Sequence, residues 1–503
     1  MMMIIDKSFL SIIPNFDSFL THWVLLVLFI YVVHEIISEW KENEIRKRAQ
    51  SKNSHIAPLV SSIIPFALTF LKNKLISIFT GMQSFSHLDI KYILSNNFQN
   101  WGKSDHFIAS FYPLLGDGII NTDQRALWSW HRSLSRPHFS RERIADADAC
   151  EEHVLRLIQW IKIQSRLKQA IDIQDLFSRL TLTVASQHLF GHCFDTLKDL
   201  FRDRPIQEGG IDVAAFCKDF ADAQSYCHAR LLLPSFVTKL IQKLSPNPSI
   251  KRVLEAMDVL IKDVVQKNLI DNSLNDQQEP QNLLDHLRQS GCSAQLLRHE
   301  LLNLLLAAKD SVASLITSCI YELAGRDEIW TQLQLECSGL AESSSISTDQ
   351  IHKLKFLRAV INETLRLHPP VGSNVRCAFE DDVLPSGIFV PAGTDFRFDI
   401  RFLQRNPEVW GKDAEEFIPD RWLDDRQIQQ REDPFRFQPF SAGPRLCLGQ
   451  QLAYMQASIV LIRLVTNFSG VELVGKSAFK ENIKEFQSMV LSFKDGLWVK
   501  FKT

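Results

Sequence analysis

Apolar residues recur with a helical period along most of the chain, most clearly between residues 128 and 367. Spacings of three and four place them on one helix face, which is typical of helices packed against a core. Alternation of apolar and polar residues, the signature of a strand, is confined to short patches such as 387–391 and 490–493. The pattern therefore predicts a mainly α protein with small β-sheets.

A nearly uninterrupted apolar run occupies residues 19–37, and a basic cluster follows at residues 41–48. About 20 apolar residues suffice to cross a bilayer, and basic flanks tend to remain cytosolic. We expect residues 1–50 to be an N-terminal membrane anchor with a transmembrane helix at about 19–38. A cleaved signal peptide would have a shorter apolar core preceded by its basic residues, and a buried amphipathic helix is the other alternative.

The rest of the chain, residues 51–503, shows no internal repeat and no low-complexity linker. We therefore expect these residues to form a single domain, the catalytic domain. A second apolar stretch at residues 57–81 contains prolines and lysines. It is more typical of a surface contact with a membrane than of a second span.

Composition narrows the class of protein. Hydrophobic residues make up 45% and charged residues 23% of the 503 residues, as in globular proteins. A net charge of −2 offers no polyelectrolyte reason to bind nucleic acid. Nine cysteines without a Cys-x-x-Cys pair argue against both a disulfide scaffold and a zinc site.

The most informative segment is FSAGPRLCLG, residues 440–449, in which Cys447 directly precedes an apolar helical run. A thiolate at a helix N-terminus is stabilised by the helix dipole and by free N–H groups. Such a sulfur can be the fifth ligand of a haem iron. Gly443 suits the positive φ of a tight hairpin, and Gly449 would let the helix run close to a flat macrocycle. For a lone cysteine, the alternative is a small buried residue.

The spacing Phe-x-x-Gly-x-Arg-x-Cys-x-Gly resembles the haem-binding loop of the cytochrome P450 monooxygenases, and every fixed position is met. The resemblance implies the cytochrome P450 fold, with Cys447 as the axial ligand of the iron. It implies that Phe440 packs beside the sulfur and that Arg445 meets a haem propionate. It also implies haem b, which is held non-covalently apart from the bond between Cys447 and iron.

Further segments occur in the order that this resemblance requires. Glu363 and Arg366 lie three residues apart on one face of an apolar helix, where the plain alternative is a weak surface pair. A buried arginine needs several partners, and Arg421 would join the pair. The three resemble the family's structural clamp, which holds the chain around the haem loop without doing chemistry.

The apolar helix expected over residues 294–324 has one polar interruption. By the resemblance, Asp310 and Ser311 are the catalytic acid–alcohol pair that relays protons, and Ala308 replaces the usual glycine. Serine keeps the hydroxyl of the usual threonine but lacks the methyl group that restricts χ1. We expect proton delivery to survive with more loss of electrons as peroxide. A solvated kink without chemistry is the alternative.

The family's remaining haem contacts also have counterparts. Trp128 and Arg132 match its Trp-x-x-x-Arg element, and Arg376 matches its second propionate arginine. Arginines suit carboxylates because they bind them in a bidentate way. The histidines lack the spacing of a metal site, and we expect three of them to be polar core or surface residues rather than iron ligands: His131, His138 and His368.

The segment GDGIIN at residues 116–121 is a near miss of a dinucleotide fingerprint, so we expect no fused flavin or nicotinamide domain. Electrons would come from a separate NADPH–cytochrome reductase. The sequence of residues 116–139 resembles that of the fungal microsomal branch of the family, whose members hydroxylate fatty acids and alkanes near the chain terminus. This resemblance implies a single-pass enzyme of the endoplasmic reticulum membrane with its catalytic domain in the cytosol.

The expected substrate is a small lipophilic molecule, most simply an alkyl chain drawn from the bilayer. A hydroxylase of terpenoids or of other secondary metabolites is the alternative. Two further alternatives are a haem-binding protein without turnover and an enzyme of this fold that rearranges a peroxide or dehydrates an oxime without external electrons. Six residues are candidates to line the substrate pocket: Asn303, Ala307, Ser373, Asn374, Met489 and Val490.

Overall fold

The computed structural model describes most of the chain from residue 87 onward. Apart from short pieces, the described residues are 87–139, 148–191, 193–201, 211–231, 246–271, 282–343 and 345–503. The expected transmembrane helix at about 19–38 and the apolar stretch at 57–81 lie outside the described residues.

The chain forms two compact units: one of residues 1–100 and 377–396, the other of residues 101–376 and 397–503. In the smaller unit, β8 (Ile388–Val390) pairs in parallel with β1 (His55–Ile56) and antiparallel with β7 (Asp382–Val383). The unit also holds α4 (His87–Lys91), the π-helix η1 (Tyr92–Asn96) and the 3-10 turn η2 (Phe98–Asn100).

The larger unit is mainly helical, as predicted. Its longer helices are α5 (Asp105–Leu115), α6 (Arg125–Ser135), α8 (Asp148–Arg166), α9 (Ile173–Phe190), α10 (Val213–Leu231), α12 (Pro248–Asp271), α14 (Ala294–Leu323), α15 (Asp327–Cys337), α17 (Lys355–Leu367) and α21 (Gln450–Asn467). Two shorter helices lie among them: α13 (Leu283–Gln289) and α16 (Thr348–Lys353). Short helices α18 (Ile400–Leu403), α19 (Pro407–Trp410) and α20 (Arg426–Glu432) lie between α17 and the cysteine loop.

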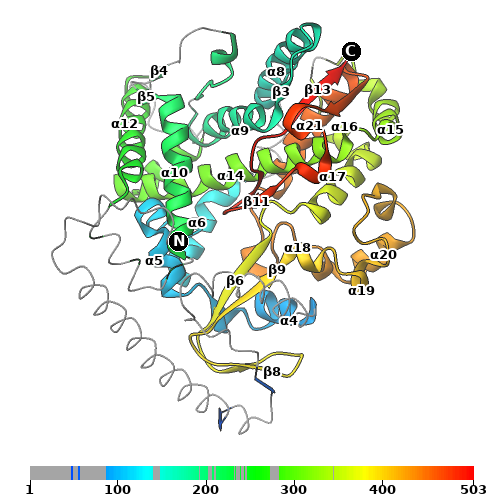
Figure 1. Ribbon diagram of the computed structural model, residues 1–503. Coiled ribbons are helices and arrows are strands. Elements are labelled where there is room, and N and C mark those ends of the chain that lie inside the picture. The colour runs from blue at the N-terminus through cyan, green and yellow to red at the C-terminus, as the bar shows by residue number, and fades with distance from the viewer. Residues whose placement is uncertain are drawn as a thin grey trace, which may run out of the picture. The chain divides into compact units, whose positions relative to one another are not determined.

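Helix α14 is the centre of the core. The Ser293 side chain caps its N-terminus by accepting from the Leu296 N–H, and the helix packs along α9 and against α17 and α21 (Figure 1). Within the described residues it is the one helix long and apolar enough to cross a membrane, yet 72% of its most apolar window is buried in the protein. Its apolar character therefore belongs to the core.

Helix α21 begins three residues after Cys447 and is buried over nearly its whole length. It packs against α8, α15 and α17. A buried ion pair between Arg463 and Glu151 joins it to α8, with 2.7 Å between Arg463 Nε and Glu151 Oε1. The cysteine loop therefore rests on a fixed part of the core.

Small sheets complete the larger unit. β10 (Gly470–Leu473), β13 (Trp498–Lys502) and β3 (Ile171–Asp172) form an antiparallel sheet, and β11 (Glu485–Gln487) pairs with β12 (Leu491–Phe493). The short pair β4 (Gln207–Glu208) and β5 (Ile211–Asp212) precedes α10. The strand patches predicted at 387–391 and 490–493 are confirmed as β8 and β12. The remaining strands are β2 (Trp101–Gly102), β6 (Ser373–Ala378) and β9 (Asp395–Asp399).

Candidate active site

The cysteine loop is a tight turn held by its own backbone. The Cys447 N–H donates to the Phe440 carbonyl oxygen at 3.0 Å. Gly443 has a φ of +65°, as predicted, and Ser441 has a φ of +62°. A left-handed non-glycine residue carries strain of about 1–3 kcal/mol, and such strain gathers at functional sites. The Phe440 ring packs on Tyr454 of α21, with 5.2 Å between ring centroids.

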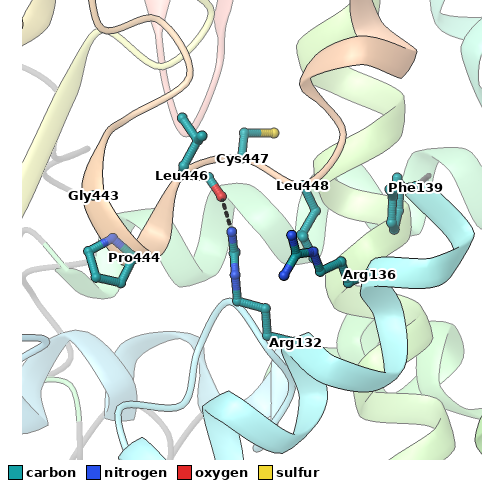
Figure 2. Close-up of a pocket in the computed structure, with 8 residues that line it drawn as sticks. All are labelled: Arg132, Arg136, Phe139, Gly443, Pro444, Leu446, Cys447 and Leu448. Carbon is teal, nitrogen blue, oxygen red and sulfur yellow. Dashed lines mark hydrogen bonds between the residues drawn. The ribbon is translucent and has the colours of Figure 1, made fainter. Parts of the chain in front are cut away.

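Cys447 faces a cavity of about 350 Å³, lined also by Arg132, Arg136, Phe139, Gly443, Pro444, Leu446 and Leu448 (Figure 2). Its side chain is exposed to this cavity, while the surrounding protein shields it from bulk water. Burial therefore raises the pKa of the Cys447 thiol, and the Gly449 N–H and the charge of Arg132 lower it in part. The sulfur thus lies on the wall of a partly open cavity.

Gly449 keeps part of this space clear. A Cβ there would lie 3.8 Å from Phe139 Cε1 and 4.0 Å from Cys447 Sγ, which are ordinary contacts. The protein by itself therefore does not require glycine at this position. The missing side chain instead leaves room for a flat group above the loop.

Arginines gather beside the cavity. Arg132 Nη2 donates to the Leu446 carbonyl oxygen at 2.8 Å, and Arg445 Nη2 donates to Asp123 Oδ1 at 2.7 Å. The Trp128 ring has both guanidinium groups near its face, with Arg445 Cζ at 4.5 Å and Arg132 Cζ at 5.7 Å from its centroid. The structure therefore brings together the predicted Trp128, Arg132 and Arg445.

These cations outnumber the carboxylates that face them. Burial lowers the pKa of both Arg376 and Arg445 to about 10, against the favourable charge of Asp123. Lys103, which the sequence did not single out, has a pKa well below its ordinary value because of burial and because of Arg445 and Arg376. A bound group with carboxylates of its own would balance this buried positive charge.

The predicted acid–alcohol pair lies where α14 borders an open space. Ala307 is exposed, although residues 301–306 before it are buried. Ser311 Oγ donates to the Ala307 carbonyl oxygen at 2.6 Å. Asp310 forms an ion pair with the buried Lys309. Although burial lowers the pKa of Lys309, Asp310 raises it above its ordinary value, so Lys309 stays charged and orients the carboxylate.

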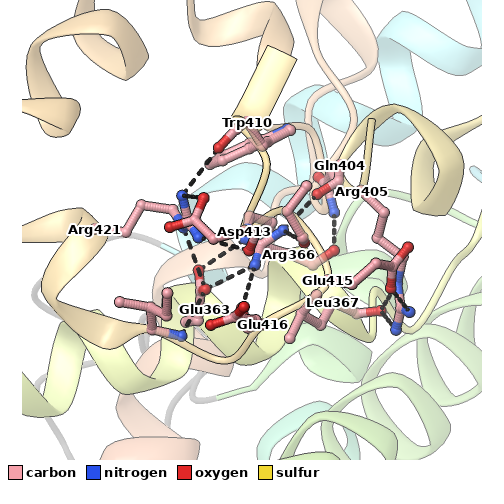
Figure 3. A network of polar contacts seen from close by, with 12 residues as sticks. Glu363, Arg366, Leu367, Gln404, Arg405, Trp410, Asp413, Glu415, Glu416 and Arg421 are labelled. Carbon is pink, nitrogen blue, oxygen red and sulfur yellow. Dashed lines mark hydrogen bonds and ion pairs between the residues drawn. The ribbon is translucent and has the colours of Figure 1, made fainter. Parts of the chain in front are cut away.

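The residues of the predicted clamp meet in one buried network (Figure 3). Arg366 Nε and Nη2 donate to the two carboxylate oxygens of Glu363 at 2.8 and 2.7 Å, and Arg421 Nε lies 3.4 Å from Glu363 Oε1. The three side chains are at most 2% exposed. Arg366 also donates to the carbonyl oxygens of three residues of the following chain: Gln404, Ala414 and Glu416.

Two partners of Glu363 were missed in the sequence. Trp422 Nε1 donates to Glu363 Oε2 at 2.9 Å and the Ile418 N–H donates to Oε1 at 3.0 Å. Glu363 thus binds both arginines, the Trp422 side chain of the turn η6 (Pro419–Trp422), and the backbone directly before that turn. Only the fold brings residue 422 to residue 363, so no local signal could identify it.

One candidate pocket residue was wrong. Asn303 is fully buried, and its amide binds backbone groups of residues 115–121 and of His299. It holds a loop to α14 and does not face a cavity. Among the other candidates, Ala307 is exposed, and Ser373, Asn374, Met489 and Val490 are half-buried.

The three histidines are buried polar residues, as expected. His131 Nε2 contacts the Asp117 carbonyl oxygen, and His138 contacts His286. His368 lies between the carboxylates of Glu322 and Glu485. None of the three lines the cavity beside Cys447.

Comparison with known proteins agrees with this arrangement. Residues 69–495 match the family described as Cytochrome P450. The chain is 32% identical over 402 residues to Cytochrome P450 52A13 of Debaryomyces hansenii, covering 76% of this chain and 75% of that protein. It is 32% identical over 402 residues to Cytochrome P450 52C2 of Candida maltosa, covering 78% and 76%. It is 31% identical over 437 residues to Cytochrome P450 monooxygenase himC of Aspergillus japonicus, covering 82% and 73%.

The chain belongs to the cytochrome P450 family. It is a haem-thiolate monooxygenase, which binds haem b and depends on a redox partner for electrons. The residues present fit that cofactor: a cysteine faces a cavity, a glycine leaves that cavity clear beside the sulfur, and buried arginines would bind carboxylates.

Proposed function

We propose that Cys447 holds the haem iron and that the enzyme hydroxylates fatty acids or other long alkyl chains at or near the terminal carbon. One observation carries the ligand assignment. All nine cysteines lie among the described residues, and Cys447 is the one that is exposed, within the cavity beside the arginines. The alkyl substrate is supported by the resemblance of residues 116–139 to the branch that hydroxylates fatty acids and alkanes.

The bound haem supplies the oxidising power, and the protein supplies binding, orientation and proton delivery. Arg132, Arg376 and Arg445 are assigned to the propionates, with Trp128 supporting two of them. Insertion of one oxygen atom from O2, with the other leaving as water, consumes two electrons and two protons. Asp310 and Ser311 are assigned to those protons.

The order of the proton path that we propose is supported by the neighbours of Asp310 and Ser311. Lys309 is paired with Asp310, so a fixed positive charge holds this carboxylate in place. Ser311 Oγ, one residue on, is half-buried at the point where α14 borders open space. The Ser311 hydroxyl would give up its proton at the reacting oxygen, and Asp310 would receive the replacing proton from solvent and pass it on to Ser311.

We further assign the electron supply to an NADPH–cytochrome reductase and the enzyme to the endoplasmic reticulum membrane. In this assignment, residues 1–50 form the single-pass anchor and residues 51–503 the cytosolic catalytic domain. The support is the apolar run at residues 19–37 and the basic cluster after it.

The decisive experiment supplies membranes that carry the enzyme and a reductase with NADPH and a panel of C12–C18 fatty acids, alkanes and terpenes. We expect hydroxylated alkyl chains, identified by mass spectrometry, with the hydroxyl group at or near the terminal carbon. Turnover of terpenes alone would replace the alkyl substrate by the alternative of a secondary-metabolite hydroxylase. Absence of NADPH-dependent oxygen uptake with every substrate would contradict a monooxygenase.

A further inference from the structure

A histidine, a cysteine and an aspartate from two segments of the larger unit meet beside α8. His153 lies on α8, and Cys193 and Asp195 lie between α9 and the 3-10 turn η4 (Lys198–Phe201). Cys193 Sγ is 3.8 Å from His153 Nε2. A carboxylate oxygen of Asp195 completes the group, whose three ligand atoms all lie within 4.8 Å of one another. Among the described residues, no other group of His, Cys, Asp or Glu side chains is arranged in this way.

The separation of sulfur and nitrogen suits a tetrahedral metal ion. Zinc binds sulfur at about 2.3 Å and nitrogen at about 2.0–2.1 Å, which places two such ligand atoms about 3.6 Å apart. The 3.8 Å between Cys193 Sγ and His153 Nε2 is close to that value. A hydrogen bond between the two side chains would explain this contact by itself, but it leaves the nearby carboxylate unexplained.

The segment that carries Cys193 and Asp195 is fixed on α9. Phe194, which lies between the two residues, is fully buried. Its N–H donates to Ser186 Oγ at 2.9 Å, and its carbonyl oxygen accepts from Thr183 Oγ1 at 3.0 Å. The two ligand residues are therefore held in place by the protein alone, which lowers the cost of ordering them when an ion binds.

Asp195 has one carboxylate oxygen to spare. Its Oδ2 accepts from Arg156 and from Lys198 Nζ, the latter at 3.1 Å. Its Oδ1 is buried, and no residue that the structure describes donates a hydrogen bond to it. Although burial raises the pKa of Asp195, the hydrogen bonds and charges of Arg156 and Lys198 hold it below its ordinary value. A buried, ionised oxygen without a donor is costly, and a bound cation would remove that cost.

The two basic side chains beside Asp195 leave room for a cation. Arg156 also donates to Glu152 Oε1 at 2.8 Å, so a second carboxylate shares its charge. The Lys198 side chain is 46% exposed, so water screens its charge. A thiolate and a carboxylate together supply two negative charges, which suits a divalent ion. Magnesium and calcium prefer oxygen ligands, whereas thiolate and imidazole favour zinc.

We propose that His153, Cys193 and Asp195 form a Zn²⁺ site that joins α8 to the segment after α9. Binding displaces the thiol proton of Cys193. The fourth position goes to water or to Gln187 Oε1, which lies 2.7 Å from His153 Nε2. No local spacing in the sequence indicates this site, because residues 153 and 193 lie 40 positions apart.

The zinc site is separate from the haem site. None of its three protein ligands lines the cavity beside Cys447. The role of the ion is to hold two segments of the fold together, so the proposal depends neither on the substrate nor on the proposed hydroxylation.

The zinc content of the haem-loaded, tag-free enzyme tests the site. After treatment with EDTA and dialysis against zinc chloride, the wild type should retain one zinc ion per haem, measured by inductively coupled plasma mass spectrometry. In Cys193→Ser and in His153→Gln the affinity for zinc should fall by more than about 10–100-fold, the loss that a merely supporting group causes. The reduced carbon-monoxide spectrum should be unchanged in both variants, which shows that they are folded.

The matched controls are Cys292→Ser, at another half-buried cysteine, and His352→Gln, at an exposed histidine. Neither residue belongs to the group of ligands, so both variants should bind zinc as the wild type does. Equal retention of zinc by the wild type and Cys193→Ser would mean an adventitious ion only and would overturn the proposal. A wild type that retains no zinc would do the same.

Two further measurements place the ion on the protein. Co²⁺ added in place of zinc should give a sulfur-to-cobalt charge-transfer band in the difference spectrum, and this band should be absent from Cys193→Ser. Zinc should slow hydrogen–deuterium exchange of amides 193–198 several-fold in the wild type and leave Cys193→Ser unchanged. The same cobalt band in Cys193→Ser, or exchange in the wild type that zinc does not alter, would contradict the site.

Discussion

At the scale of single residues, the site depends on a sulfur and a hydroxyl whose surroundings set their chemistry. Cys447 faces the cavity, and burial raises the pKa of its thiol, so binding to a metal must displace its proton. Ser311 stands at the exposed part of α14 and donates to its own helix in this state. Each role follows from position as much as from residue type.

Cys447→Ser should abolish the red-shifted Soret band of the reduced carbon-monoxide complex, together with oxygen insertion. A serine hydroxyl holds its proton far more tightly than a thiol and cannot replace a thiolate on iron. Cys193→Ser, at a half-buried cysteine away from the cavity, is the matched control and should keep the band. A wild-type spectrum in Cys447→Ser would disprove the ligand assignment.

Ser311→Ala should lower product formation by about 10²-fold, the lower end for a positioned proton donor, and raise the ratio of hydrogen peroxide to product. Ser311→Thr should lower that ratio below the wild-type value, because the added methyl group restricts χ1. The measurement is peroxide and product per NADPH consumed. An unaltered ratio in both variants takes Ser311 off the proton path.

At the scale of elements, α17 is tied to the chain that leads to the cysteine loop. Glu363 and Arg366 project from α17 and bind Arg421, Trp422 and the backbone of residues 404–418. These connecting residues contain only short helices, so they have little core of their own. The buried network of charged residues therefore attaches this segment to α17, as apolar packing does for the longer helices.

Glu363→Gln should lower the free energy of unfolding by about 3–5 kcal/mol, because it leaves two buried arginines without their anion. Chemical denaturation followed by circular dichroism measures the loss. Glu152→Gln breaks the exposed i,i+4 pair with Arg156 on α8 and should cost less than about 1 kcal/mol. Equal losses in the two variants would mean that the clamp contributes no more than a surface pair.

At the scale of the whole larger unit, charged residues distant in sequence meet at His368. Its ring nitrogens lie 2.6 Å from Glu322 of α14 and 2.7 Å from Glu485 of β11. Although burial raises the pKa of Glu485, the hydrogen bond and charge of His368 and the charge of Arg401 lower it to about 2. Such a carboxylate stabilises the native state above its unfolded pKa and loses this effect as the pH falls.

Glu485→Gln should therefore destabilise the protein most at neutral pH. Its difference from the wild type in the free energy of unfolding should hold above pH 4.5 and shrink as the pH falls towards 2. Denaturant titrations at pH 7 and pH 3 measure this. A difference that stays constant between the two would exclude an ionic role for Glu485.

Local patterns in the sequence determined much of this protein. Helical periodicity predicted the mainly α fold, because period reports which positions turn inward. The spacing around Cys447 predicted a cysteine in a tight loop before a helix, because the glycines and backbone of that loop decide its geometry. Each of these two signals is formed by residues that lie close to one another in the sequence.

Only the tertiary structure decided which inward positions meet. Asn303 was expected in a substrate pocket, yet it binds residues 115–121, far away in sequence. His131 and Glu300 lie far apart in the sequence, yet α6 and α14 place His131 Nδ1 3.1 Å from Glu300 Oε2. A periodic pattern predicts that a residue is buried. Which residue it contacts, and therefore what role it has, depends on how distant segments of the chain pack together.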